Sequence, residues 1–275
     1  MLFSPQDFSK KEQYTFEDLL ALVRFLRSPA GCEWDRAQTH ASVRKNLLEE
    51  AYEVAEGIDR DDPTILREEL GDFLFQAAFH MVMEEEQARS LPEEIITDVC
   101  RKMISRHPHL FGSTPERVAA EAVPARWEEL KRAEKGQHST TETLRAIPKT
   151  LPALMYAQKM ADKAARAGFT YESVEEAGEK VREEWDELTA AKTRKEQEEE
   201  LGDMLFALVN YGRFLGLDAE EALVRAAQKF LGRFAVLEEN LASSNREMTS
   251  CTKNELLSAW YELKNTEKST KIAKI

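Results

Sequence analysis

The sequence predicts an all-α protein, on three observations. Apolar residues recur at three- and four-residue spacing in several long stretches, which places them on one face of a helix. Glycine and proline, which interrupt helices, are scarce at 11 and 9 of 275 residues. No segment shows the apolar and polar alternation of a half-buried strand.

The first helices are predicted by three apolar stripes separated by helix-breaking segments. The stripes are Phe16-Leu19-Leu20-Val23-Leu26, Leu48-Ala51-Tyr52-Ala55-Ile58 and Leu66-Leu70-Phe73-Leu74-Ala77. The segment 27–35 separates the first helix from the next one, and 59–63 joins the second stripe to the third. Asp62 is expected to be an N-cap, with Pro63 at the first helical position. Because this connection is short, the two helices should be antiparallel neighbours.

The second half of the chain repeats the first. "LLEEAYEVAEGID" resembles "VREEWDELTAA", and "REELGDFLFQAAFH" matches "EEELGDMLFALVNYG". The offset is 134 residues from Glu49 to Glu183 and 131 from Glu69 to Glu200, and the difference falls in the turn, where length changes are tolerated. We therefore expect two tandem helical domains, at residues 1–135 and 153–275, joined by a polar linker at 136–152.

Composition and charge narrow the class of protein. The formal net charge of −13 disfavours nucleic acid as a main partner, because phosphates need a basic face. No apolar run approaches 18 residues and the start lacks the pattern of a secretory signal, so no membrane span is expected. Three widely spaced cysteines without a CxxC pair favour a reducing cytoplasm over disulfides or zinc.

Each copy carries an EExxE segment followed by an ExxD segment. The first copy has Glu49, Glu50, Glu53, Glu69 and Asp72, and the second has Glu183, Glu184, Glu187, Glu200 and Asp203. Residues three or four apart share a helix face, so four or five carboxylates can converge between two antiparallel helices.

A solvated acidic helix face is the ordinary explanation for such runs. Like charges one turn apart are unfavourable, however, and Glu49, Glu53, Glu69 and Asp72 have no Lys or Arg four residues later. The same spacing also occurs twice. Carboxylates alone favour a hard cation, Mg²⁺ or Mn²⁺, and such ions commonly bind substrate phosphates as well.

Cationic and aromatic residues follow the second copy. Lys229 and Arg233 are four residues apart, as are Trp260 and Lys264. Such pairs suit a nucleotide, because cations bind phosphates and an aromatic face stacks on a base, although Trp260 fits a core position equally well. The second copy therefore predicts the more complete site.

The ordered motifs resemble the MazG family of all-α nucleoside triphosphate pyrophosphohydrolases. They extend over residues 15–264 and include "GCEWDRAQTH", "LLEEAYEV", "REELGDFLFQ", "RHPHLFG", "ARWEELK", "LPALMYAQKM", "GFTY", "EELGDMLFALVN" and "KFLGRF". Glu33 departs from the proline usual in that family, outside the acidic motif.

The resemblance implies Mg²⁺-dependent hydrolysis of nucleoside triphosphates to monophosphates and pyrophosphate, by a homodimer of intertwined helical bundles. It implies that the C-terminal copy is the main catalyst, without excluding the first. The implied metal ligands are Glu183, Glu184, Glu187, Glu200 and Asp203, with Glu49, Glu50, Glu53, Glu69 and Asp72 as a second possible set. The implied nucleotide contacts are Lys131, Lys180, Lys229, Arg233, Trp260 and Lys264. Glu184 or Glu187 would orient or deprotonate the attacking water.

Alternatives remain at this point. The chain could be a non-enzymatic adaptor whose acidic surface binds a regulatory protein partner, or an enzyme narrow for one nucleotide such as dUTP. The phosphorus attacked is also open, because attack at either the α or the β position gives the same products. The expected biological roles are removal of damaged nucleotides and control of nucleotide pools.

Overall fold

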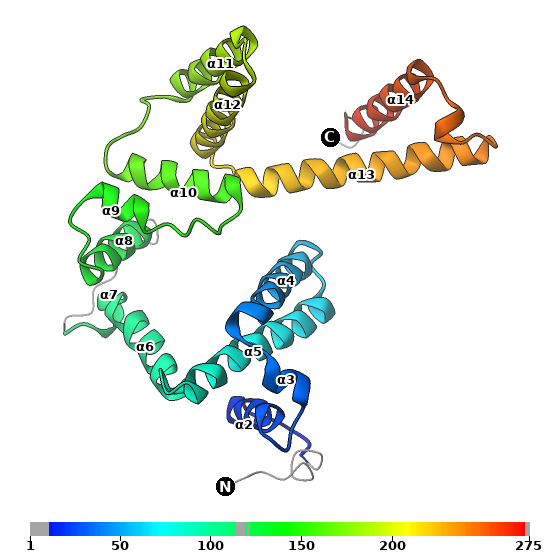
Figure 1. Ribbon diagram of the computed structural model, residues 1–275. Helices are drawn as coiled ribbons and strands as arrows, with labels where there is room; N and C mark the ends of the chain where they lie inside the picture. The colour runs from blue at the N-terminus through cyan, green and yellow to red at the C-terminus, as the bar shows by residue number, and fades with distance from the viewer. Residues whose placement is uncertain (1–10, 114–118, 120–121, 273–275) are drawn as a thin grey trace. The chain divides into compact units, whose positions relative to one another are not determined.

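The computed structural model describes residues 11–113, 119 and 122–272, and within these residues all regular structure is helical (Figure 1). The prediction of an all-α fold is confirmed. The chain consists of two compact units, residues 1–131 and 132–275. Within the described residues, no helix is both long enough and apolar enough to span a membrane.

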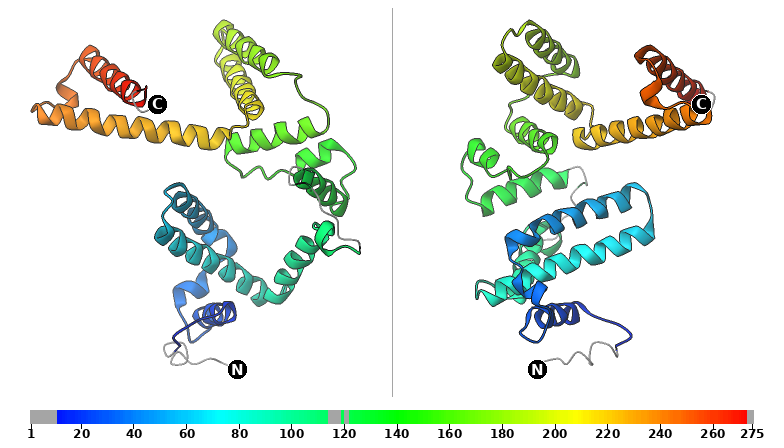
Figure 2. Two further views of the ribbon diagram at one scale, coloured as in Figure 1. Left: turned by 180° about the vertical axis from the view of Figure 1, so that it is seen from behind. Right: turned by 45° about the vertical axis from the view of Figure 1, so that its right-hand side comes forward.

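The first unit is built on a long helical hairpin. Its helices are α2 (Phe16–Arg27), α3 (Glu33–Ala37), α4 (His40–Asp59), α5 (Pro63–Glu86), α6 (Pro92–Ser105) and α7 (Pro108–Phe111), and α8 (Val123–Glu134) ends just beyond the unit boundary. Helices α4 and α5 lie side by side, as both views in Figure 2 show.

Caps fix where these helices begin. The Thr15 side chain accepts a hydrogen bond from the Asp18 backbone N–H at the start of α2, and Thr39 does the same for Ser42 in α4. Asp62 caps α5 and Pro63 is its first residue, as the sequence predicts. The turn before α5 therefore sets the register of the hairpin.

The core of the first unit lies between α2, α4 and α5. Its buried residues are Leu20, Val23, Val43, Ala78, Phe79, Val82 and Met83. Arg27, only 8% exposed, closes one edge of this core. Its guanidinium pairs with the Glu86 carboxylate at 2.9 and 2.8 Å, donates to the carbonyls of Asp35 at 2.6 Å and Gln38 at 3.3 Å, and lies over the Phe79 ring.

The second unit repeats the hairpin. Its helices are α9 (Thr140–Arg145), α10 (Ala153–Arg166), α11 (Val174–Ala190), α12 (Arg194–Phe214), α13 (Ala219–Ser243) and α14 (Lys253–Ile272), with a 3-10 turn at Met248–Ser250. Helices α11 and α12 form the hairpin and α10 packs against α12. The predicted linker holds α9 and the buried Ile147, and α9 contacts α10. The domain boundaries at 135 and 153 stay a prediction.

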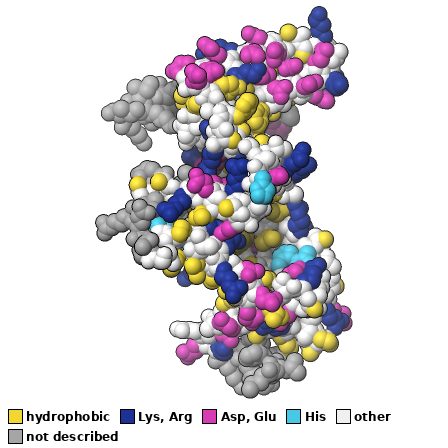
Figure 3. Space-filling view, turned by 90° about the vertical axis from the view of Figure 1, so that its left-hand side faces the viewer, with side chains coloured by type: hydrophobic (Ala, Val, Ile, Leu, Met, Phe, Trp, Pro, Cys, Tyr) yellow, Lys and Arg dark blue, Asp and Glu magenta, His cyan; other side chains and the backbone are white. Residues whose placement is uncertain are grey.

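Large apolar side chains stay exposed on both hairpins and on α13. They include Tyr52, Leu70, Phe73, Trp185, Leu201, Leu205, Leu223, Phe230 and Leu231. Figure 3 shows one face of the molecule on which apolar side chains stand at the surface among charged ones. Exposed apolar surface of this extent marks an interaction surface.

Candidate metal centres on the helical hairpins

A buried face of each hairpin's first helix carries one of the predicted acids. On α4, Val43 and Gly57 are buried and stand seven residues on either side of Glu50, so all three share the face toward α5. Gly57 lies where a Cβ would meet the Leu66 backbone at 3.0 Å, so the hairpin is closely packed beside the acids. On α11, Ala177 and Glu184 have the same seven-residue spacing and both are buried.

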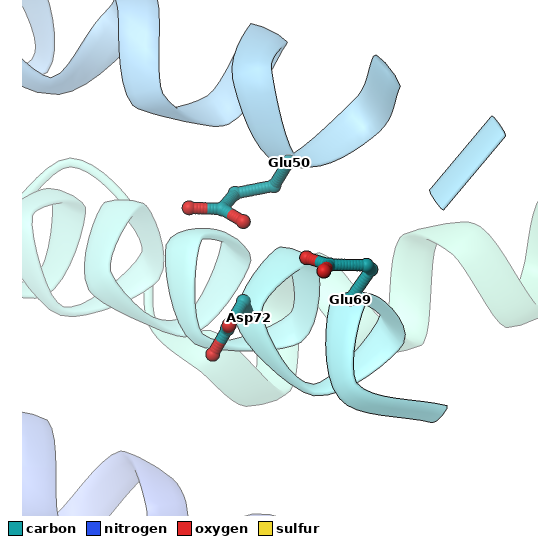
Figure 4. A group of neighbouring side chains, drawn as sticks. All are labelled: Glu50, Glu69 and Asp72. Carbon is teal, nitrogen blue, oxygen red and sulfur yellow. The ribbon is translucent and has the colours of Figure 1, made fainter. Parts of the chain in front are cut away.

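Three carboxylates meet in the first unit. Glu50 of α4 and Glu69 and Asp72 of α5 have ligand oxygens within 4.8 Å of one another. Figure 4 shows the Glu50 side chain reaching toward α5, where Glu69 and Asp72 lie about one turn apart. We call these residues the N-terminal cluster.

Burial and repulsion between carboxylates both raise pKa values in this cluster. Burial, followed by the charges of Asp72 and Glu53, raises the pKa of Glu50. Burial and the neighbouring Glu53 likewise raise the pKa of Glu69. Glu53 therefore stands close to the cluster, whereas Glu49 is exposed and outside it.

The equivalent carboxylates meet in the second unit. Glu184 of α11 and Glu200 and Asp203 of α12 form the C-terminal cluster, also within 4.8 Å. Burial and then Glu187 raise the pKa of Glu200. Of the remaining predicted ligands, Glu187 is exposed but near Glu200, and Glu183 is exposed.

Lys180 distinguishes the C-terminal cluster. Its ammonium lies 2.7 Å from a carboxylate oxygen of Glu183 and 2.7 Å from one of Glu184. Hydrogen bonds to these two acids raise the pKa of Lys180. The predicted nucleotide contact Lys180 thus lies at the acids.

The other predicted nucleotide contacts lie on α8, α13 and α14. Lys131 pairs with Glu128 on its own helix. The Trp260 ring packs on Phe230 with a centroid distance of 5.0 Å, and the Lys264 ammonium lies over the Tyr261 ring. Lys229 is exposed and Arg233 half-buried on α13, whose main packing partners are α14 and α10. These residues therefore lie on other helices than the acids of the C-terminal cluster, which lie on α11 and α12.

Sequence reasoning missed a histidine pair in the first unit. His40 begins α4 and His80 lies on α5, and their Nδ1 atoms are 2.7 Å apart with the rings stacked. The Nε2 atom of His40 also lies 2.9 Å from a Glu84 carboxylate oxygen. Burial, and then His40, lower the pKa of His80. A separation of 40 residues hides this pair from any local motif.

Both clusters fit a hard divalent cation. Their donors are all carboxylate oxygens, which Mg²⁺ and Mn²⁺ prefer. Oxygens bound to one Mg²⁺ at about 2.0–2.1 Å lie roughly 3 to 4 Å apart, so small side-chain movements would let each trio share an ion.

Comparison with known proteins identifies the family. Residues 38–111 match the MazG nucleotide pyrophosphohydrolase domain, a range that contains the N-terminal cluster. The chain is 41% identical to the nucleoside triphosphate pyrophosphohydrolase/pyrophosphatase MazG of Thermotoga maritima, over 84% of this chain and 88% of that protein. It is 39% identical to the nucleoside triphosphate pyrophosphohydrolase of Escherichia coli K12, over 90% and 97% respectively. The uncharacterized protein YabN of Bacillus subtilis is 38% identical over 93% of this chain and 53% of its own length. The first two matches cover most of this chain and most of each relative, so the chain belongs to the MazG family.

Proposed function

We propose that this protein hydrolyses nucleoside triphosphates, both NTPs and dNTPs, to nucleoside monophosphates and pyrophosphate, with Mg²⁺ or Mn²⁺ as the cofactor. The observation that carries the proposal is the pair of three-carboxylate clusters, each between antiparallel helices of one hairpin. The names of the Thermotoga and Escherichia relatives, which match across most of the chain, support the same activity. We place the reaction in the cytoplasm and in nucleotide-pool control or housecleaning.

The acids would hold the cation and activate the attacking water molecule. Glu184, Glu200 and Asp203 would hold the divalent cation, which when bound neutralises charge on the triphosphate. Glu187 is exposed beside Glu200, where it can accept a proton from a water molecule. Glu183 would complete the ligand set after releasing Lys180.

The cations bind the substrate. Lys180 stands at the acids, where an ammonium can donate to a phosphate oxygen and stabilise the leaving pyrophosphate. Lys131, Lys229, Arg233 and Lys264 would neutralise the remaining phosphate charge, and the half-buried Trp260 offers a ring to a base. Charge neutralisation and positioning are the main demands of this chemistry.

A homodimer could bring the predicted nucleotide contacts and the acids together. Leu205 of α12 and Leu231 of α13 are 45% and 67% exposed, and burying such side chains is favourable. A second copy could cover them and set Lys229 and Arg233 of α13 opposite an acidic hairpin. A homodimer is therefore part of the proposal.

The test is pyrophosphate release from each NTP and dNTP assayed separately with Mg²⁺. Glu200→Gln and Asp203→Asn should strongly reduce release, since each removes a charge from the C-terminal cluster. Glu198→Gln is the matched control, because Glu198 is exposed and pairs with Arg194. Equal release by all three variants would refute the metal role. No release by the wild type from any nucleotide would favour the adaptor alternative.

Two additions sharpen the assay. Glu69→Gln and Asp72→Asn measure the share of the N-terminal cluster, and we expect the C-terminal variants to lose more. Phosphate should be measured beside pyrophosphate, because the name of the Thermotoga relative also includes pyrophosphatase.

A further inference from the structure

The two acidic clusters differ at one position that touches them. Lys180 stands four residues before Glu184, one helical turn away. The residue four before Glu50 is Asn46, which carries no charge. The repeat therefore replaces an ammonium by an amide at equivalent places.

Lys180 is the internal counter-ion of its cluster. Its Nζ atom bridges Glu183 and Glu184 at 2.7 Å each, and the Glu184 side chain is almost completely buried. A buried carboxylate needs such a partner, because leaving its charge unpaired is costly. The ammonium thus supplies the neutralisation that a metal ion would otherwise give.

No such counter-ion lies at the N-terminal cluster among residues 11–113, 119 and 122–272. Among the residues that the structure describes, no ion pair joins Glu50, Glu69 or Asp72 to a Lys or Arg. Three carboxylates therefore lie within 4.8 Å of one another without a Lys or Arg paired to them in the described part of the chain.

We propose that Lys180 makes the two clusters unequal cation sites. The N-terminal cluster binds Mg²⁺ or Mn²⁺ in the nucleotide-free protein. In the C-terminal cluster, the Lys180 ammonium replaces part of the positive charge that a metal ion would bring. The inference rests on the proposed function, because it assumes that both clusters are metal sites. It adds that the C-terminal site takes up its metal with the triphosphate, whose oxygens compete for the Lys180 ammonium.

Coulomb interactions set the size of the difference. A cation entering the C-terminal cluster must displace Lys180 from two carboxylates or bind beside its positive charge. A divalent cation about 4 Å from one unit positive charge loses roughly 30-fold in affinity at the dielectric constant of water, and more at that of a protein surface. A cation entering the N-terminal cluster meets no such repulsion, because Asn46 is uncharged.

The experiment measures Mn²⁺ binding to the full-length, nucleotide-free protein from the electron paramagnetic resonance signal of free Mn²⁺. The wild type should show one tighter and one weaker class of site per chain, separated by about 30-fold or more. Glu69→Gln should remove the tighter class, and Glu200→Gln should leave it. Lys180→Asn should tighten the weaker class toward the other, and Asn46→Lys should weaken the tighter one.

Lys180→Asn and Asn46→Lys exchange the residues at equivalent positions of the repeat, so they should have opposite effects on Mn²⁺ affinity. If circular dichroism shows that Lys180→Asn or Asn46→Lys does not fold, the remaining variant still tests the inference. The loss of the tighter class of site in Glu69→Gln tests it as well. Equal affinities in the wild type, loss of the tighter class in Glu200→Gln, or no change in folded Lys180→Asn would overturn the inference.

The proposed function is tested separately on the same samples by pyrophosphate release. Active enzyme with equal Mn²⁺ sites would overturn this inference and leave the function standing. Unequal Mn²⁺ sites in a protein that releases no pyrophosphate from any nucleotide would overturn the proposed function and leave this inference standing.

Discussion

Replacing Glu50 with Gln should stabilise the metal-free protein. Glu50 is half-buried and faces Asp72, Glu53 and Glu69, and burial followed by these charges raises its pKa above the ordinary value of 4.5. The change keeps the shape of the side chain and removes three unfavourable like-charge pairs. It should also remove the ability of the cluster to hold a divalent cation.

The size follows from the number of neighbours. Each exposed or half-exposed like-charge pair costs about 0.2–0.5 kcal/mol, so three pairs amount to about 1 kcal/mol of the free energy of unfolding. In a chain of this length that corresponds to about 2–4 °C in the unfolding midpoint. With Mg²⁺ at about 100 times its dissociation constant, the wild type should instead gain about 2.7 kcal/mol and become the more stable protein.

The assay is thermal unfolding of both proteins in EDTA and in Mg²⁺. Glu49→Gln is the matched control, because Glu49 is the adjacent acid but is exposed and outside the cluster. A Glu50→Gln midpoint in EDTA no higher than that of Glu49→Gln would refute the argument from repulsion. An equal gain from Mg²⁺ in wild type and Glu50→Gln would refute the metal role of Glu50.

Three further predictions concern the core, the histidine pair and the exposed apolar surface. Arg27→Met should lower the free energy of unfolding by about 3 kcal/mol in chemical denaturation, because it leaves Glu86 and two carbonyl acceptors without their partner. Arg24→Met removes a partly exposed ion pair and should lower the free energy of unfolding by less than about 1 kcal/mol. The lowered pKa of His80 means that the unfolded chain binds its proton more readily, so stability should be full above the ordinary value of 6.5 and fall as pH drops below it. His80→Phe should remove that part of the fall in thermal unfolding between pH 7.5 and 5.5, and an unchanged pH profile would contradict it. Leu231→Asp should shift the protein from dimer toward monomer in analytical ultracentrifugation, and a wild type that is monomeric at all concentrations would contradict the dimer.

Local patterns predicted the hairpins well. The helices that the apolar stripes predict, the Asp62 cap and the Pro63 start are all present in α4 and α5, because they depend on neighbours within one or two turns. The three-residue spacing of Glu69 and Asp72 likewise sufficed to place them together.

The orientation of the EExxE segment was harder to predict. A four-residue spacing places Glu49 and Glu53 on one helix face, yet Glu50 is the member that meets Glu69 and Asp72. The signal was present at longer range, in the seven-residue spacing from Val43 through Glu50 to Gly57. It becomes readable only once that face is known to be buried against α5.

Long-range contacts were not accessible from the sequence. Arg27 meets Glu86 across 59 residues, and His40 meets His80 across 40. No periodicity encodes such pairs, since they depend on how α2 and α4 pack on α5. The assignment of Lys229, Arg233, Trp260 and Lys264 to a nucleotide site stays a prediction for the same reason.

Pyrophosphate release measured for each nucleoside triphosphate with Mg²⁺ tests the central claim most directly. The wild type should release pyrophosphate and nucleoside monophosphate in equal amounts, and Asp203→Asn should release far less of both while unfolding at a similar temperature. Undiminished release by folded Asp203→Asn, or release of phosphate and diphosphate nucleotide by the wild type, would contradict the account.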